Sequence, residues 1–223
     1  MDTKLMEKMV ASGAQFGYSK TKRHPSAKKY VFATKNNADI IDLNYTEKML
    51  DEATNFIKKL GEEKKTILFV STKPESKKII ESAAKALNMP YVENRWIGGT
   101  LTNFPQIKKR VDVLLDLKAK KEKGELEKYT KKEQSDFARQ IEKMTKNFGG
   151  LVSMTKKPDA VVIIDVRKEK IALVEANSVN VPVISLSNTD CDFNAVDYPI
   201  VGNDASRGSV QFFVDAFVEA YKG

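Results

Sequence analysis

Cysteine and histidine are almost absent from this chain of 223 residues, which contains only Cys191 and His24. A single cysteine excludes an internal disulfide, and one cysteine with one histidine argues against a zinc site. A Cys–His nucleophilic pair is also disfavoured, because the carboxylates of Asp190 and Asp192 should raise the pKa of the neighbouring thiol. We therefore expect a cytosolic protein with no catalytic residue, no cofactor and no metal.

Long apolar runs and nucleotide-binding motifs are missing as well. No stretch approaches the roughly 20 apolar residues of a membrane span, so we expect no membrane partner. Neither Gly-x-Gly-x-x-Gly nor Gly-x-x-x-x-Gly-Lys-Ser/Thr occurs, and the turn after residues 66–70 reads Ser71-Thr72-Lys73-Pro74. These absences argue against a small-molecule substrate, and a nucleotide-dependent Rossmann-type enzyme stays only as the alternative function.

Acidic residues are unevenly distributed. The chain has 38 Lys and Arg against 30 Asp and Glu, for a net charge of +8 and a pI near 9.3. Residues 104–157 hold 15 basic and 8 acidic residues, and residues 8–38 hold 7 basic residues and no acidic one. Such segregation is typical of an electrostatic binding surface for an anionic partner. Because most of these residues are lysines, we expect contacts to phosphates rather than readout of bases.

Apolar runs alternate with helix-like stripes, which predicts an α/β fold with a parallel, doubly wound sheet. The expected strands are residues 66–70, 160–165, 181–186 and 198–201, and residues 30–32 and 40–43 flank Asn36-Asn37 as an expected hairpin. Asn44 with Glu47, and Thr72 with Glu75, resemble helix starts. The last helix is expected at residues 210–221. The helices are expected to pack on the sheet through Met49, Leu50, Ala53, Phe56, Ile57 and Leu60, through Ile79, Ile80, Ala83, Ala84 and Leu87, and through Ile171, Ala172, Val174 and Ala176.

Residues 104–157 differ in character from the rest. Two charged helices are predicted there, separated near Lys123-Gly124, and residues 130–133 form a capping box. Their narrow apolar seams favour an antiparallel α-helical coiled-coil hairpin, with an ordinary pair of surface helices as the alternative. The seams are Ile107, Val111, Leu114 and Leu115 on one helix and Phe137, Ile141, Met144, Phe148 and Leu151 on the other. We expect a Rossmann-like α/β domain at 1–103 and 158–223, including an N-terminal helix and the β-hairpin, with the basic helical hairpin at 104–157 inserted into it.

Two features have competing interpretations. Arg95 and Trp96 precede Gly98-Gly99, where close backbone approach and a guanidinium fork could grip a planar or phosphorylated partner; the alternative is a buried Trp on a turn before a helix. Five aspartates near strand ends could hold a hard cation such as magnesium, although such residues more often cap helices and turns. These are Asp165, Asp190, Asp192, Asp197 and Asp204.

Several blocks, in order along nearly the whole chain, resemble the bacterial small-subunit ribosomal protein S-two family. They are residues 13–17 (GAQFG), 40–43 (IIDL), 94–103 (NRWIGGTLTN), 158–159 with 165–169 (PD and DVRKE) and 197–204 (DYPIVGND). The chain departs from the family at Gln15 and Tyr18, where histidine is usual, at residues 21–25, where Arg-Arg-Trp-Asn-Pro is usual, and at Gly208, where arginine is common.

The resemblance implies a Rossmann-like (flavodoxin-like) domain interrupted by a helical hairpin, without catalytic activity. It further implies a structural constituent of the cytoplasmic small ribosomal subunit that binds 16S-type rRNA, supports translation and contacts neighbouring ribosomal proteins. One such neighbour is the mRNA-binding ribosomal protein S-one, where an organism has one. Our expected rRNA-binding residues are Lys20, Lys22, Arg23, His24, Lys28 and Lys29; Arg95 and Trp96; and Lys108, Lys109, Lys118, Lys120 and Lys121.

Overall fold

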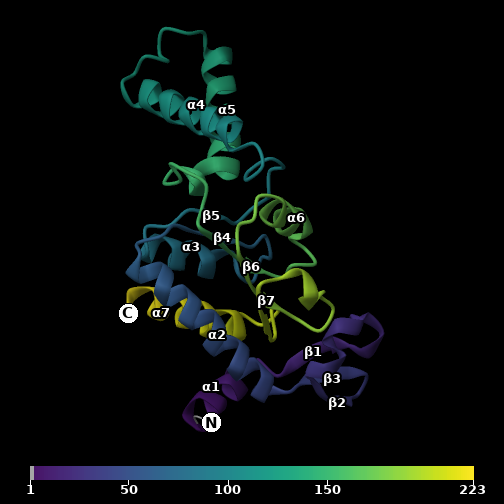
Figure 1. Ribbon diagram of the computed structural model, residues 1–223. Helices are drawn as coiled ribbons and strands as arrows, with labels where there is room; N and C mark the ends of the chain where they lie inside the picture. The colour runs from purple at the N-terminus through teal and green to yellow at the C-terminus, as the bar shows by residue number, and fades with distance from the viewer. Residues whose placement is uncertain (1–2) are drawn as a thin grey trace.

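A five-stranded parallel sheet is the centre of the protein, as seen in the computed structural model, which describes residues 3–223 (Figure 1). Its strands in spatial order are β5 (Tyr91–Val92), β4 (Ile67–Val70), β6 (Ala160–Ile164), β7 (Val183–Ser187) and β8 (Tyr198–Val201). Counted along the chain this order is 2-1-3-4-5, the flavodoxin-like arrangement of a doubly wound sheet. The predicted fold class and the predicted strands are therefore confirmed.

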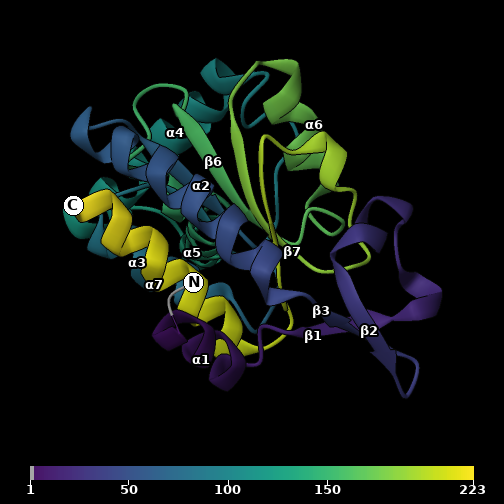
Figure 2. The ribbon, with the colours of Figure 1, turned by 60° about the horizontal axis from the view of Figure 1, so that its bottom comes forward.

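In the parallel sheet, Val70 of β4 pairs with Val92 of β5 on one side and with Ile163 of β6 on the other. Ile163 in turn pairs with Ser185 of β7. One face of the sheet, including Phe69 and Val162, packs on α1 (Thr3–Ser12), α2 (Leu43–Glu62), α3 (Lys77–Ala86) and α7 (Arg207–Lys222). Figure 2 shows α2 and α7 side by side across this face. The other face packs on α6 (Lys170–Ser178) and on the beginning of α4 (Phe104–Glu122).

A small antiparallel sheet lies beside the carboxyl edge of β7. It contains β1 (Phe16–Ser19), β3 (Ala38–Ile41) and β2 (Val31–Lys35), in that order. The predicted hairpin is confirmed: Asn36 and Asn37 have φ of 50° and 62°, the left-handed values that a tight turn between twisted strands needs. Strand β1 has no counterpart among the predicted elements. The 3-10 turns η1 (Lys20–Lys22) and η2 (Pro25–Tyr30) connect β1 to β2.

Helices α4 and α5 (Lys131–Phe148) project from the sheet domain (Figure 1). Away from the sheet they share a separate apolar cluster of Leu114, Leu117, Ile141 and Met144. The predicted capping box at the start of α5 is confirmed, since Glu133 N–H donates to Thr130 Oγ1 and Thr130 N–H donates to the Glu133 carboxylate. The antiparallel coiled coil stays a prediction. The short turn η3 (Gly149–Leu151) then leads back to the sheet.

Several local predictions were wrong. Asp42, not Asn44, caps α2, because its carboxylate accepts the Asn44 N–H. Helix α3 begins after Ser76, and Thr72 instead donates its hydroxyl to Glu169. Leu115 is 43% exposed while Leu117 is 9% exposed, so the buried stripe of α4 continues at Leu117.

The apolar residues of α6 are also placed differently. Ile171 and Val174 are 62% and 56% exposed, whereas Ala172 and Ala176 are fully buried. The helix therefore faces the sheet through its small residues.

No helix within residues 3–223 has the length and apolarity to cross a membrane.

Candidate nucleic-acid interface

Residues 20–35 form an exposed basic surface at the end of the molecule opposite the projecting helices (Figure 1). Lys20, Lys22, Lys28 and Lys29 are all exposed on the 3-10 turns, as expected for residues that neutralise phosphates. His24 caps η2: its Nδ1 accepts the Ser26 N–H at 3.3 Å and lies 2.8 Å from the Ser26 hydroxyl. The ring is thus half-buried beside the lysines rather than projecting as a ligand of its own.

Arg23 has an internal partner. Its Nε and Nη2 atoms donate to the two carboxylate oxygens of Asp39 at 2.7 and 2.6 Å, and Asp39 is fully buried. The hydrogen bonds to Asp39 raise the pKa of Arg23 above its usual value. The positive charge is therefore compensated inside the protein, and the geometry favours a positioning role for Arg23, which ties the turns to β3, over the expected phosphate contact.

Trp96 and the glycine pair surround a buried carboxylate. Trp96 Nε1 donates to Glu175 Oε1 at 3.0 Å, and Gly99 N–H donates to the same oxygen at 2.8 Å. Glu175 Oε2 accepts the N–H groups of Leu101 and Thr102 at 3.1 and 3.3 Å and the Thr102 hydroxyl at 3.2 Å. The backbone turn does hold an anion, but the anion is supplied by α6 of the same chain.

These hydrogen bonds decide the charge state of Glu175. Burial alone would raise its pKa, but the donors from Trp96, Gly99, Leu101 and Thr102 lower it below its usual value. Trp96 is 7% exposed, so the expected contact of its indole with RNA has no free ring face. Arg95 is exposed and stays a candidate for such a contact.

The expected lysines of α4 do not share one surface. Lys108, Lys109 and Lys121 are exposed and Lys118 is half-buried. Lys120 Nζ lies 2.7 Å from the Asp116 carboxylate on the preceding turn. At about 100° per residue these five positions are spread around the helix, so a single flat partner cannot contact all of them.

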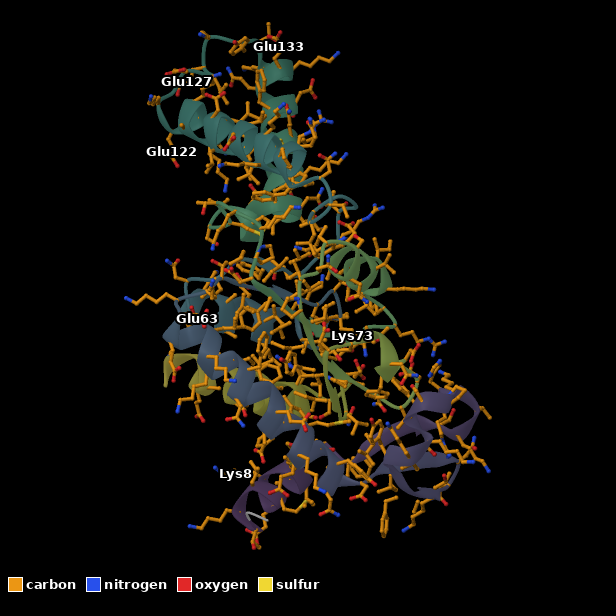
Figure 3. All side chains as sticks on the ribbon, in the orientation of Figure 1. Lys8, Glu63, Lys73, Glu122, Glu127 and Glu133 are labelled. Carbon is orange, nitrogen blue, oxygen red and sulfur yellow. The ribbon has the colours of Figure 1, made fainter. Side chains whose placement is uncertain are left out.

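At the carboxyl ends of β4, β6 and β8, the region where nucleotides bind in such folds, a buried ammonium lies between two carboxylates. Lys73 follows β4, and its ammonium lies 2.6 Å from the carboxylate of Asp165 after β6 and 3.1 Å from that of Asp204 after β8. Lys73 is labelled in Figure 3, and its ammonium lies 5.8 Å from the centre of the Tyr18 ring. Two carboxylates here would repel a phosphate, so the geometry gives the nucleotide-dependent alternative no support.

The charges of this buried cluster shift several pKa values. Burial alone would lower the pKa of Lys73, but Asp204 and Asp165 raise it above its usual value. Burial, with the charges of Asp165 and Asp190, raises the pKa of Asp204 to about 7 although Lys73 opposes the shift. The buried cluster therefore holds more carboxylate than its single ammonium can balance.

Asp165, Asp204 and Cys191 are the described residues whose ligand atoms could jointly reach a metal, since these atoms lie within 4.8 Å of one another. The Lys73 ammonium already supplies positive charge to both carboxylates. Burial, followed by Asp165 and Asp190, raises the pKa of the Cys191 thiol, which opposes a thiolate ligand or nucleophile. The expected effect of Asp190 on this thiol is thus confirmed.

Three important side chains were missed by the sequence interpretation: Asp39, Lys73 and Glu175. Glu175 had the clearest signal, because it is an acidic residue on an otherwise apolar face of α6. Lys73 lies in the turn whose lack of glycine was noted, but its partners are 92 and 131 residues away. Nothing in the sequence pairs Asp39 with Arg23, because both belong to turn and strand segments rich in other charges.

Comparison with known proteins agrees with this geometry. The family model described as Ribosomal protein S2 matches residues 9–223. A "Small ribosomal subunit protein uS2" of Dictyoglomus thermophilum is 39% identical over 216 residues, which are 97% of this chain and 88% of that protein. The protein of the same name from Petrotoga mobilis is 40% identical over 222 residues, 98% of this chain and 77% of its own length. The "Small ribosomal subunit protein uS2c" of Emiliania huxleyi is 38% identical over 211 residues, 95% and 92% of the two chains. This chain therefore belongs to the ribosomal protein S2 family, a family of structural proteins of the small ribosomal subunit.

Proposed function

We propose that this chain, as a structural constituent of the small ribosomal subunit, binds small-subunit rRNA through two basic surfaces at opposite ends of the molecule. The observation that carries the proposal is the placement of charge. Lys20, Lys22, Lys28 and Lys29 are exposed on one end, and residues 104–157, with a net charge of +7, project from the other. Two separated lysine surfaces suit a folded RNA recognised by its shape and backbone.

The proposal assigns different roles to two parts of the chain. Residues 1–103 and 158–223 are the rigid Rossmann-like mount, and residues 104–157 are the inserted basic hairpin. The separate apolar cluster of α4 and α5 supports this division. Phe104, Ile107 and Val111 pack with the sheet residues, so the base of the hairpin is fixed to the mount.

Neighbouring ribosomal proteins are the second class of partner in this proposal, including S-one where an organism has one. The exposed aromatic side chains of Phe16 and Phe32, which are 53% and 77% exposed, support a protein contact beside the basic turns.

Binding of the full chain to in vitro transcribed small-subunit rRNA, measured across salt concentrations, tests the proposal. Lys20, Lys22, Lys28 and Lys29 are changed to glutamine in one variant. Each lost phosphate contact should make the slope of log K against log salt shallower by roughly 0.7 to 0.9, so the whole set should change it by about 3. The matched control changes four exposed lysines of α2 and α3, namely Lys48, Lys58, Lys59 and Lys78.

The control variant should bind like the unmodified chain. Equal effects of the two variants would show that only net charge matters and would contradict the assignment of the first surface. Absence of salt-dependent binding by the unmodified chain would contradict rRNA binding itself.

A further inference from the structure

Helix α5 carries a basic stripe that the sequence interpretation did not single out. Lys132, Arg139, Lys143 and Lys146 are spaced by 7, 4 and 3 residues within α5. At about 100° and 1.5 Å per residue they fall within an arc of about 60° and extend over about 21 Å. All four side chains are exposed. We call these four residues the α5 stripe.

The α5 stripe lies opposite the side by which the helix packs. Ile141 and Met144 are buried against α4, with Phe137 and Phe148 packed beside them. On the helix these positions are centred about 160° from the stripe. The stripe therefore faces away from the rest of the protein, where a rigid external partner can approach it along its full length.

The positive charge of the stripe is little compensated. Among residues 3–223, no carboxylate lies within 4.0 Å of the ammonium groups of Lys132, Lys143 or Lys146. Arg139 Nη2 lies 3.0 Å from Asp136, but both side chains are well exposed, at 72% and 59%. A solvent-exposed pair of this kind contributes little and is readily exchanged for a stronger anion.

Acidic residues lie near both ends of the stripe. The tip of the hairpin carries Glu122, Glu127 and Glu133, as Figure 3 shows. At the base of α5, a hollow beside Lys146 is lined by Glu81 and Glu93. Lys121, Lys123, Lys128 and Lys131 lie at the same tip, so the stripe is distinguished by its alignment on one helix face rather than by acidic ends.

The base of the stripe is joined to Asn94, the residue before Arg95. Asn94 donates its side-chain amide to the Lys146 carbonyl at 3.1 Å and accepts from Lys77 Nζ at 3.1 Å. Arg95 is exposed next to this bridge. Arg95 is therefore one residue away from a direct contact with the backbone of Lys146, whereas the α4 lysines point in several directions.

We propose that the α5 stripe is the RNA-facing surface of the hairpin and contacts the phosphate backbone of an A-form RNA duplex. The four charges run in a nearly straight line along one face of the helix, which suits recognition of a duplex by its shape and phosphates. This inference rests on the proposed function, and it assigns one helix face and one class of RNA structure to it.

Two matched variants of the full chain test the face. One changes Lys132, Arg139, Lys143 and Lys146 to glutamine, and the other changes Lys108, Lys109, Arg110 and Lys121 of α4, which are all exposed. Glutamine keeps a comparable helix propensity, and circular dichroism checks the fold. With in vitro transcribed small-subunit rRNA, the α5 variant should show a slope of log K against log salt that is shallower by about 3. The α4 variant should change the slope by less than about 1.

A tethered probe locates the RNA directly. Ser135 lies between two residues of the stripe and Asp112 lies on the exposed side of α4, while Cys191 is 1% exposed and should resist labelling. An iron chelate attached to Ser135→Cys should cleave both strands of an rRNA duplex, and one attached to Asp112→Cys should cleave weakly or not at all.

A larger salt effect from the α4 variant, or stronger cleavage from position 112, would overturn the inference while rRNA binding stands. Unchanged binding by both hairpin variants, with a clear effect of the Lys20, Lys22, Lys28 and Lys29 variant, would overturn it too. If the unmodified chain does not bind the rRNA, the proposed function fails, and the inference fails with it.

Discussion

Replacing Glu175 with glutamine should destabilise the whole protein although it changes only one atom and one charge. The carboxylate accepts hydrogen bonds on both oxygens, two on Oε1 and three on Oε2. In either orientation of the amide, its NH2 group faces at least two of these donors. A buried donor that loses its acceptor costs about 1 to 3 kcal/mol, so E175Q should lower the free energy of unfolding by about 2 to 6 kcal/mol.

Urea unfolding followed by tryptophan fluorescence measures this loss of unfolding free energy with a probe that contacts residue 175. Trp96 is the only tryptophan of the chain, and its indole N–H contacts Glu175. The matched control is Glu142→Gln, which makes the same change at an exposed position of α5. A loss of unfolding free energy below about 1 kcal/mol for E175Q, or an equal loss for both variants, would show that the donors from Trp96, Gly99, Leu101 and Thr102 do not need a carboxylate.

The pH dependence gives a second check on the same residue. The folded state lowers the pKa of Glu175 below its ordinary value of 4.5. A carboxylate with a depressed pKa stabilises the folded state above the unfolded pKa, and this contribution is lost as the pH falls through the folded pKa. The difference in stability between the unmodified chain and E175Q should therefore be full near neutral pH and should shrink in acid.

Three further outcomes are expected. Because the folded state raises the pKa of Asp204 from its ordinary value of 3.8 to about 7, this group binds its proton more tightly when the protein is folded. Stability should therefore fall as the pH rises from about 4 to about 7, and Asp204→Asn should flatten that trend in urea midpoints. Thr130→Ala removes the capping box and should cost about 1 kcal/mol, seen as faster hydrogen exchange in the first turn of α5. Gly150→Ala places a Cβ against the backbone oxygen of Tyr91 and should lower the free energy of unfolding by about 1 to 3 kcal/mol. Gly98→Ala, with open space around the added Cβ, should be near neutral. Equal melting temperatures for the two variants would contradict this prediction.

The centre of the parallel sheet could be predicted from the sequence because β4, β6 and β7 are buried at every position, whereas the two-residue edge strand β5 was not predicted. Ile67–Val70 and Ala160–Ile164 are apolar at every position, and a run of this kind is interpretable without knowledge of its neighbours. The asparagine turn and the capping box were predictable for a similar reason, since each depends on residues next to it in the chain. Strand β1 was not, because its four residues, Phe16–Ser19, have no buried member.

The candidate site was less predictable because its decisive contacts join distant residues. The exposed lysines of residues 20–29 needed only their composition to be found. The partner of Arg23 is Asp39 on β3, 16 residues further on, and the partner of Trp96 lies 79 residues further on. The α5 stripe has a periodic pattern, but only the packing of Ile141 and Met144 shows which side of the helix is free.

The cradle around Glu175 also sets the direction in which the hairpin points. It fastens the backbone of Gly99, Leu101 and Thr102, immediately before α4, to a helix that packs on the sheet. The orientation of the hairpin is thus fixed at its base by the sheet domain, while its tip has no comparable attachment to that domain within residues 3–223. Helical turns could be added or removed near Gly124 during evolution without altering the angle at which α4 leaves the sheet. The length of the hairpin can therefore vary independently of its orientation.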